Sequence, residues 1–211
     1  DLFYVHRRDH NIEIEEVTNS LSNLVKKGKT KSIGFSEIAP SSLRRASKIH
    51  HIAAIQSEYS LSTRAPEMGL LQACNELGTA LVAFSPVGRS LLTDRPLTYD
   101  FAQSLDFTKV NPRFNKSNYD HNISITDKFR NYAQDLGVAS ATLSIAWLLS
   151  KGDHIIPIPG TRSVDHLKEL IAAIQFDMTD EIKNEIENIL PLGWAYGDRY
   201  SEGQWIGPER Y

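Results

Sequence analysis

The chain of 211 residues has a single cysteine, Cys74, so no disulfide can form within it and nothing indicates an oxidising compartment. Neither charge is in surplus: 23 Lys and Arg against 26 Asp and Glu give a formal net charge of -3. This balance gives no support to a nucleic-acid or membrane-surface partner. No apolar run approaches the roughly 18 residues of a membrane span, and no signal-peptide pattern opens the chain. We therefore expect a cytoplasmic protein.

The lone cysteine lies in an apolar helical stretch from Met68 to Leu77. A reactive thiol requires exposure and a lowered pKa, so we expect Cys74 to be a buried structural thiol. The chain also has no initiator methionine and opens directly on the apolar run Leu2 to Val5. This start predicts either a fragment or a further N-terminal part.

A short apolar run followed by an amphipathic segment repeats along the chain, which indicates a parallel sheet covered by helices. Residues 86–122 have no clear period and are expected to form a long functional loop. The tail, residues 192–211, is rich in aromatic side chains and is expected to drape over a surface or pocket. The predicted strands are residues 2–5, 32–36, 53–56, 80–84 and 155–158. The predicted helices are residues 14–27, 66–77, 123–136, 141–150 and 163–174, together with a short helix that begins at residue 40.

Two architectures suit this rhythm, a doubly wound open sheet and a (β/α)8 TIM barrel. Polar or small residues end four of the strands: His6, Ser36, Gln56 and Ser85. No G-x-G-x-x-G follows any strand, which counts against a dinucleotide-binding doubly wound domain and favours the barrel. Five parallel strands cannot close a barrel, so about five of the eight βα units are present. We expect one domain over residues 1–211.

The candidate site residues each have a structural alternative. His6 fits a catalytic or a structural role at a strand end, and Arg89 fits either a phosphate-binding or a solvated position. Residues 159–163 lead from a strand into a helix N-terminus, which is an anion site or simply a helix capped by Ser163. No metal ligand set is proposed.

Several motifs follow one another along the chain: Asp1–Arg7, Leu24–Lys29, Ile33–Glu37, Ile55–Ser60, Val82–Arg89, Asn111–Phe114, and Ala146–Leu149 through Pro157–Thr161. In this order they resemble the motifs of the aldo-keto reductases, and the resemblance runs from Asp1 to about Leu190. Within that family the chain is most similar to the bacterial and fungal branch with pyridoxal-type and general aldehyde reductases.

The resemblance implies an oxidoreductase that binds NADP(H), with NAD(H) as the alternative, and reduces a small carbonyl substrate. His6 matches the histidine of the family's Asp-Tyr-Lys-His tetrad, which orients the substrate carbonyl. The other three members precede the segment that matches Asp1. The implied cofactor residues are Ser36 and Gln56 at the nicotinamide carboxamide, Phe84 stacked on the nicotinamide, Ser85, Pro86, Val87, Gly88 and Arg89 around the pyrophosphate, and Gly160, Thr161, Arg162 and His166 around the adenosine and its 2′-phosphate.

The sequence departs from the family pattern at Glu37, where many members have Asn, and at His166, where an Arg or Tyr is common. Three other functions also stay open. The chain could be a non-catalytic cofactor-binding regulatory subunit, an inactive truncated barrel, or an aldolase or isomerase that binds sugar phosphates at the last loop. Substrate identity and oligomeric state are not readable from the sequence.

Overall fold

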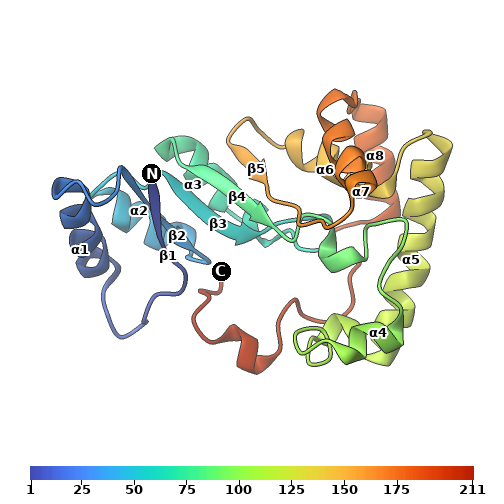
Figure 1. Ribbon diagram of the computed structural model, residues 1–211, viewed down its shortest axis with the longest axis horizontal. Helices are drawn as coiled ribbons and strands as arrows, with labels where there is room; N and C mark the ends of the chain where they lie inside the picture. The colour runs from blue at the N-terminus through green and yellow to red at the C-terminus, as the bar shows by residue number, and fades with distance from the viewer.

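The computed structural model describes residues 1–211 and contains one sheet of five strands, each parallel to the next. The spatial order is β1-β2-β3-β4-β5, the same as the order along the chain (Figure 1). A doubly wound sheet would reverse its order at a switch point, whereas a barrel wall keeps the chain order, so the barrel prediction is supported. The strands are β1 (Leu2–Val5), β2 (Ser32–Ser36), β3 (Ala54–Glu58), β4 (Ala80–Phe84) and β5 (Ile155–Pro157).

Helices fill the connections between strands, and three of them begin at a side-chain cap. The hydroxyls of Thr98, Ser163 and Thr179 accept hydrogen bonds from the backbone N–H groups three residues later. None of the helices combines the length and apolarity needed to cross a bilayer. The helices are α1 (Ile14–Lys26), α2 (Pro40–Ser47), α3 (Leu70–Leu77), α4 (Tyr99–Ser104), α5 (Lys116–Asp135), α6 (Ser140–Leu149), α7 (Val164–Ala172) and α8 (Asp180–Ile189).

The predicted loop over residues 86–122 is wrong at two places, which are helical. Helix α4 lies inside it, and α5 begins at Lys116, seven residues before the predicted start at Ile123. The buried face of α5 includes Asn122 and Thr126, both of which are fully buried and hydrogen-bonded. Polar residues in the buried positions hide the apolar period by which a helix is recognised.

Two further differences concern helix boundaries. The predicted helix over 66–77 is divided into a 3-10 turn, Ala65–Glu67, and helix α3, because Gly69 adopts φ +117° between them. Helix α8 was not expected from the sequence, although Ile182, Ile186 and Ile189 follow a helical period. The remaining predicted strands and helices are confirmed within about three residues, as is usual for element ends.

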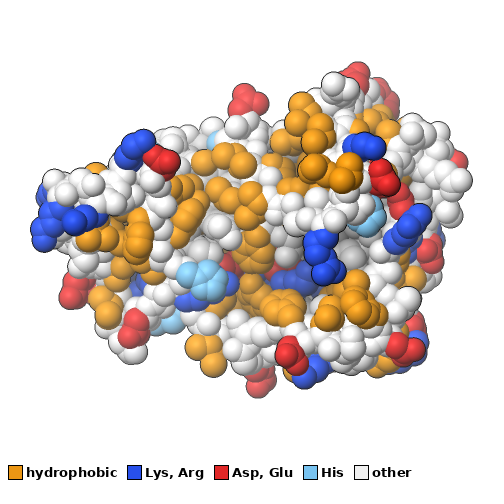
Figure 2. Space-filling model, viewed as in Figure 1, with side chains coloured by type: hydrophobic (Ala, Val, Ile, Leu, Met, Phe, Trp, Pro, Cys, Tyr) orange, Lys and Arg blue, Asp and Glu red, His pale blue; other side chains and the backbone are white.

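The hydrophobic core lies between the sheet and its covering helices. Alternate strand residues such as Ile33 and Phe35 are fully buried, and in α6 nine of ten residues are buried, among them Trp147. The opposite face of the sheet is more open, and Tyr4 lies across Gly34, where a Cβ would come within 2.6 Å of the tyrosine ring. The alternation of apolar residues along each strand decides which of its faces packs against the helices. Apolar side chains also gather on the face of the molecule shown in Figure 2.

Cys74 of α3 is fully buried, as the sequence predicts, and burial raises its pKa to about 12. We expect a thiol-specific reagent at pH 8 to label the native protein far more slowly than the urea-unfolded chain, because both access and thiolate are lacking. The measurement is the labelling rate followed by mass spectrometry. Equal rates in the native and unfolded states would contradict this burial.

Candidate functional site

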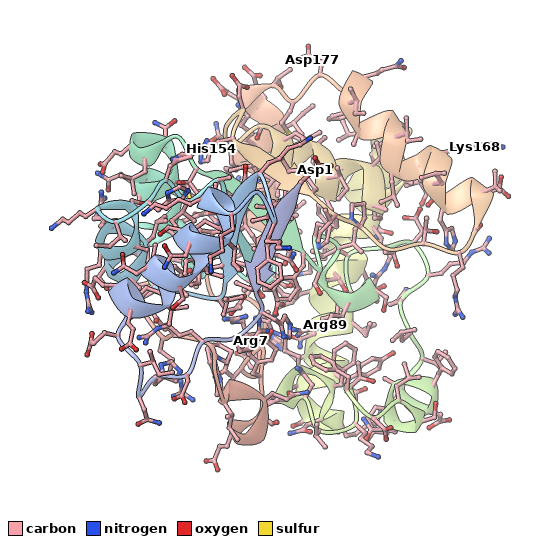
Figure 3. The ribbon with its side chains drawn as sticks, turned by 60° about the vertical axis from the view of Figure 1, so that its left-hand side comes forward. Asp1, Arg7, Arg89, His154, Lys168 and Asp177 are labelled. Carbon is pink, nitrogen blue, oxygen red and sulfur yellow. The ribbon has the colours of Figure 1, made fainter.

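The carboxyl ends of the strands meet at one edge of the sheet. Figure 3 shows Arg7, which follows β1, and Arg89, which follows β4, at the same end of the molecule, away from Asp1 and His154 at the strand starts. A cavity of about 540 Å³ opens at this end. In parallel barrels this edge carries binding and catalytic groups. The cavity is lined by His6, Arg7, Ser36, Gln56, Phe84, Ser85, Arg89, Phe107, Thr108 and Tyr200.

Six residues predicted from the sequence are among those that line this cavity: His6, Ser36, Gln56, Phe84, Ser85 and Arg89. They come from the ends of consecutive strands. Ser36 and Gln56 are direct partners in the parallel register of β2 and β3, so the sheet itself fixes the spacing of their side chains.

Two of these polar groups retain free hydrogen-bonding capacity. The Ser36 hydroxyl accepts a hydrogen bond from Arg7 Nη1 at 3.0 Å and therefore keeps its own O–H for another partner. The Gln56 side-chain amide is half-buried and makes no hydrogen bond within the chain. An O–H donor beside an uncommitted amide matches the donors and acceptors of a carboxamide.

The turn after β4 has an unusual backbone. Ser85, Gly88, Arg89 and Ser90 all have positive φ, and three of these four residues are not glycine. At Gly88 a Cβ would lie 2.8 Å from Ser62 Oγ, so this position requires glycine for space as well as for φ. Pro86 and Val87 complete the turn, which the Gly88 N–H closes onto the Ser85 carbonyl at 2.9 Å. Non-glycine residues in this conformation cluster at functional sites.

The second predicted cofactor segment lies outside the cavity. Gly160, Thr161, Arg162 and His166 are exposed, and they occupy the loop after β5 and the first turn of α7. Ser163 caps α7 through the His166 N–H, as the structural alternative supposed, and Arg162 has no ion pair. Their assignment to the adenosine end of a cofactor stays a prediction.

Beneath the cavity, two buried carboxylates bind three arginines. Glu58 Oε2 accepts from Arg89 Nη2 at 2.5 Å and lies 3.4 Å from Arg199 Nη1, while its Oε1 lies 3.7 Å from Arg113 Nη1. Arg199 Nη2 also pairs with Glu37. All five side chains are at least nine-tenths buried. The Arg89 guanidinium is thus paired within the protein, although three arginines share two carboxylates and the cluster keeps one net positive charge. The role of Arg89 at a pyrophosphate stays a prediction.

Glu37 departs from the family pattern for a reason visible in the structure. It has φ +57°, and its Oε1 accepts the Glu58 N–H at 2.8 Å. Its backbone carbonyl accepts the Glu209 N–H at 2.8 Å, so Glu37 also holds the tail. The Glu209 carboxylate in turn accepts from Arg8 Nε at 2.6 Å and from the Ala39 N–H at 2.7 Å. The tail drapes over the site, as predicted.

Three lining residues were not identified from the sequence: Arg7, Phe107 and Thr108. Position next to His6 at a strand end is a signal for Arg7, whereas no local pattern identifies the other two. The fourth, Tyr200, is one of the tail aromatics for which the sequence leaves two roles open, lining a pocket or anchoring the tail. Phe107 and Tyr200 form an aromatic wall with ring centroids 6.3 Å apart, and the Arg89 guanidinium carbon lies 4.7 Å from the Phe107 ring centre. Burial, reinforced by Glu37 and Glu58, raises the pKa of Tyr200.

Trp194, another aromatic residue of the tail, anchors the tail to the rest of the protein and does not line the cavity. Its ring is buried and its Nε1 donates to the Leu61 carbonyl at 2.8 Å. The tail therefore supplies both an anchor and, through Tyr200, part of the cavity wall. No group of three or more His, Cys, Asp or Glu side chains is placed to hold a metal ion.

A parallel sheet in chain order, covered by helices and bearing a cavity at its carboxyl edge, defines the wall of a (β/α)8 barrel. The chain belongs to the aldo/keto reductase family, whose sequence model matches residues 1–191. It is 36% identical over 203 residues to the probable aldo-keto reductase 1 of Glycine max, covering 96% of this chain and 58% of that protein. It is 35% identical over 206 residues to the aldo-keto reductase yakc [NADP(+)] of Schizosaccharomyces pombe, covering 96% and 61%.

The solved structures agree with this assignment. The glycerol dehydrogenase of Gluconobacter oxydans superposes with a TM-score of 0.77 at 25% identity, covering 90% of this chain and 58% of that one. A thermostable aldo-keto reductase, Tm1743, superposes with a TM-score of 0.68 at 24% identity, covering 90% and 59%. The chain thus spans about three-fifths of the length of the relatives it matches.

The buried ion network predicts a large effect of removing one carboxylate. Glu58→Gln leaves buried arginines without their acid and is expected to lower the free energy of unfolding by about 3–5 kcal/mol. The control is Glu76→Gln, which breaks the exposed pair with Arg44 and is expected to leave the free energy of unfolding nearly unchanged. Urea unfolding of the three proteins measures both values. Similar losses in the two variants would show that burial of the network contributes little.

The docked tail predicts a pH dependence. Burial opposes ionisation of Glu209, but hydrogen bonds from Ser42, the Ala39 N–H and Arg8 together leave its pKa below the usual 4.5. A lowered folded-state pKa stabilises the protein above about pH 4.5, and this contribution disappears as the pH falls through the folded pKa. The stability gap between the native protein and Glu209→Gln should therefore be constant from pH 7 to 5.5 and close in acid. Urea unfolding at several pH values tests this, and a gap independent of pH would refute it.

Proposed function

We propose that the site binds NADP(H) and reduces an aldehyde or ketone to the alcohol, in the whole protein of which this sequence is the described part. The observation that carries the proposal is the convergence of His6, Ser36, Gln56 and Phe84 on one cavity from the ends of consecutive strands. The name of the Schizosaccharomyces pombe relative, which includes NADP(+), supports the choice of cofactor.

The residues of the cavity fit a nicotinamide. The free O–H of Ser36 and the uncommitted amide of Gln56 bind the carboxamide, and the Phe84 ring offers a face for stacking. The turn of residues 85–90, with its run of positive φ values, is the segment that we assign to the pyrophosphate. We assign the 2′-phosphate to Arg162, an exposed arginine without an ion pair that directly precedes the N-cap of α7; an anion at a helix N-terminus beside a cation supports this assignment.

When bound, NADPH supplies the hydride that the substrate carbonyl carbon receives. His6, exposed at the cavity, donates a hydrogen bond to the carbonyl oxygen, which orients the carbonyl and stabilises the charge that develops on this oxygen. The oxygen then takes a proton to give the alcohol. By the family resemblance this proton comes from a tyrosine that precedes the matched segment. We place the reaction in the cytoplasm.

A titration with NADPH tests the cofactor site. The native protein should bind at micromolar concentration with a change in NADPH fluorescence, and NADH should bind more weakly. Gln56→Ala removes the carboxamide partner and should raise the Kd for NADPH roughly three- to tenfold, the cost of a lost hydrogen bond. The control Gln72→Ala, on the surface of α3, should leave the Kd unchanged.

Turnover of a neutral aldehyde, followed as NADPH oxidation at 340 nm, completes the test. Binding with turnover supports the reductase. Binding without turnover would overturn the catalytic part and leave a cofactor-binding protein. Absence of NADPH binding would overturn the proposal as a whole.

A further inference from the structure

The cavity is electropositive, and one of its cations is unpaired. Its lining includes His6, Arg7 and Arg89 but no aspartate or glutamate. Arg89 pairs with Glu58 below the cavity. Arg7 is half-buried and forms no ion pair with any acid of residues 1–211, in contrast to the adjacent Arg8, which pairs with Glu209. Arg7 is therefore the arginine of the lining that no carboxylate of the chain pairs with.

Arg7 is also held in place. Its Nη1 donates to the His6 carbonyl at 2.6 Å and to Ser36 Oγ at 3.0 Å, which leaves Nε and Nη2 without a partner in the chain. Gly207 of the tail has φ +102°, and a Cβ at this position would lie 3.0 Å from the Arg7 Cβ and Cγ. The tail backbone thus packs against the aliphatic part of Arg7. An oriented guanidinium with free N–H groups is suited to bind a carboxylate.

The position of Arg7 separates it from the proposed phosphate sites. It follows β1, beside His6, whereas the proposed phosphate-binding segments follow β4 and β5 at the other side of the sheet. Phe107 and Tyr200 face the same cavity and form an apolar wall for the body of a substrate. Arg7 therefore lies next to His6, at which the substrate carbonyl is proposed to bind.

We propose that the carbonyl substrate carries a carboxylate and that Arg7 is the residue that selects for it. The inference rests on the proposed function. The carbonyl group lies at His6, the carbon skeleton lies along Phe107 and Tyr200, and the carboxylate accepts hydrogen bonds from the free N–H groups of Arg7. A charge-assisted pair in a partly buried cavity favours the acid over its neutral ester by about ten- to hundredfold.

The experiment compares 4-formylbenzoate with methyl 4-formylbenzoate, which have the same aldehyde and ring. Their Kd values are measured by calorimetry on the protein saturated with NADP+, so that no turnover occurs. We expect the acid to bind at least tenfold more tightly than the ester. Arg7→Gln should reduce this ratio to within about twofold, and Arg7→Lys should retain part of it because the charge remains.

The control variant is Arg95→Gln, which removes the charge of an exposed arginine without an ion pair and should keep the full ratio. Any effect of Arg7 on the cofactor, through Ser36, is common to both ligands and cancels in the ratio. Equal affinities in the native protein, a ratio that persists in Arg7→Gln, or failure of both ligands to bind would each overturn the inference. Turnover of the ester with NADPH, measured on the same sample, reports separately on the proposed function.

Discussion

The arrangement of the site depends on the burial of two carboxylates, Glu37 and Glu58, at the carboxyl edge of the sheet. A buried carboxylate is tolerated only when its hydrogen bonds and charge are satisfied. The partners come from the turn after β4, the segment after α4 and the tail, through Arg89, Arg113 and Arg199. If one of these segments moved away, a buried carboxylate would lose an arginine partner. The loop and the tail are therefore ordered together.

This dependence divides the site into two parts. Ser36, Gln56 and Phe84 stand on strands and owe their spacing to the sheet ladder. Phe107 and Tyr200 stand on the long connection and the tail, and their place depends on Arg89, whose guanidinium lies over both rings. The proposed cofactor side is therefore fixed by the fold, whereas the proposed substrate side is fixed by ion pairs and can vary without change to the sheet.

The same division explains what the sequence predicts. Strands and their polar ends follow from local apolar runs, so Ser36, Gln56 and Ser85 were identified, whereas Phe84 was identified only through the family resemblance. The partners of Glu58 are 31, 55 and 141 residues away along the chain, and no local pattern indicates such pairs. Glu58 itself carries a weak signal, since it lies two residues after Gln56 and must face the same side of the strand. Helix α5 was placed too late because Asn122 and Thr126 occupy buried positions.

The two arginines after β1 show how the tail sets the chemistry of the cavity. Arg8 pairs with the carboxylate of Glu209 in the tail, while Gly207 lies against the stem of Arg7 and carries no side chain. The tail thus neutralises one cation and orients its neighbour without neutralising it. The guanidinium of Arg7 therefore keeps Nε and Nη2 free of partners within residues 1–211, and the proposed recognition of a carboxylate rests on these groups.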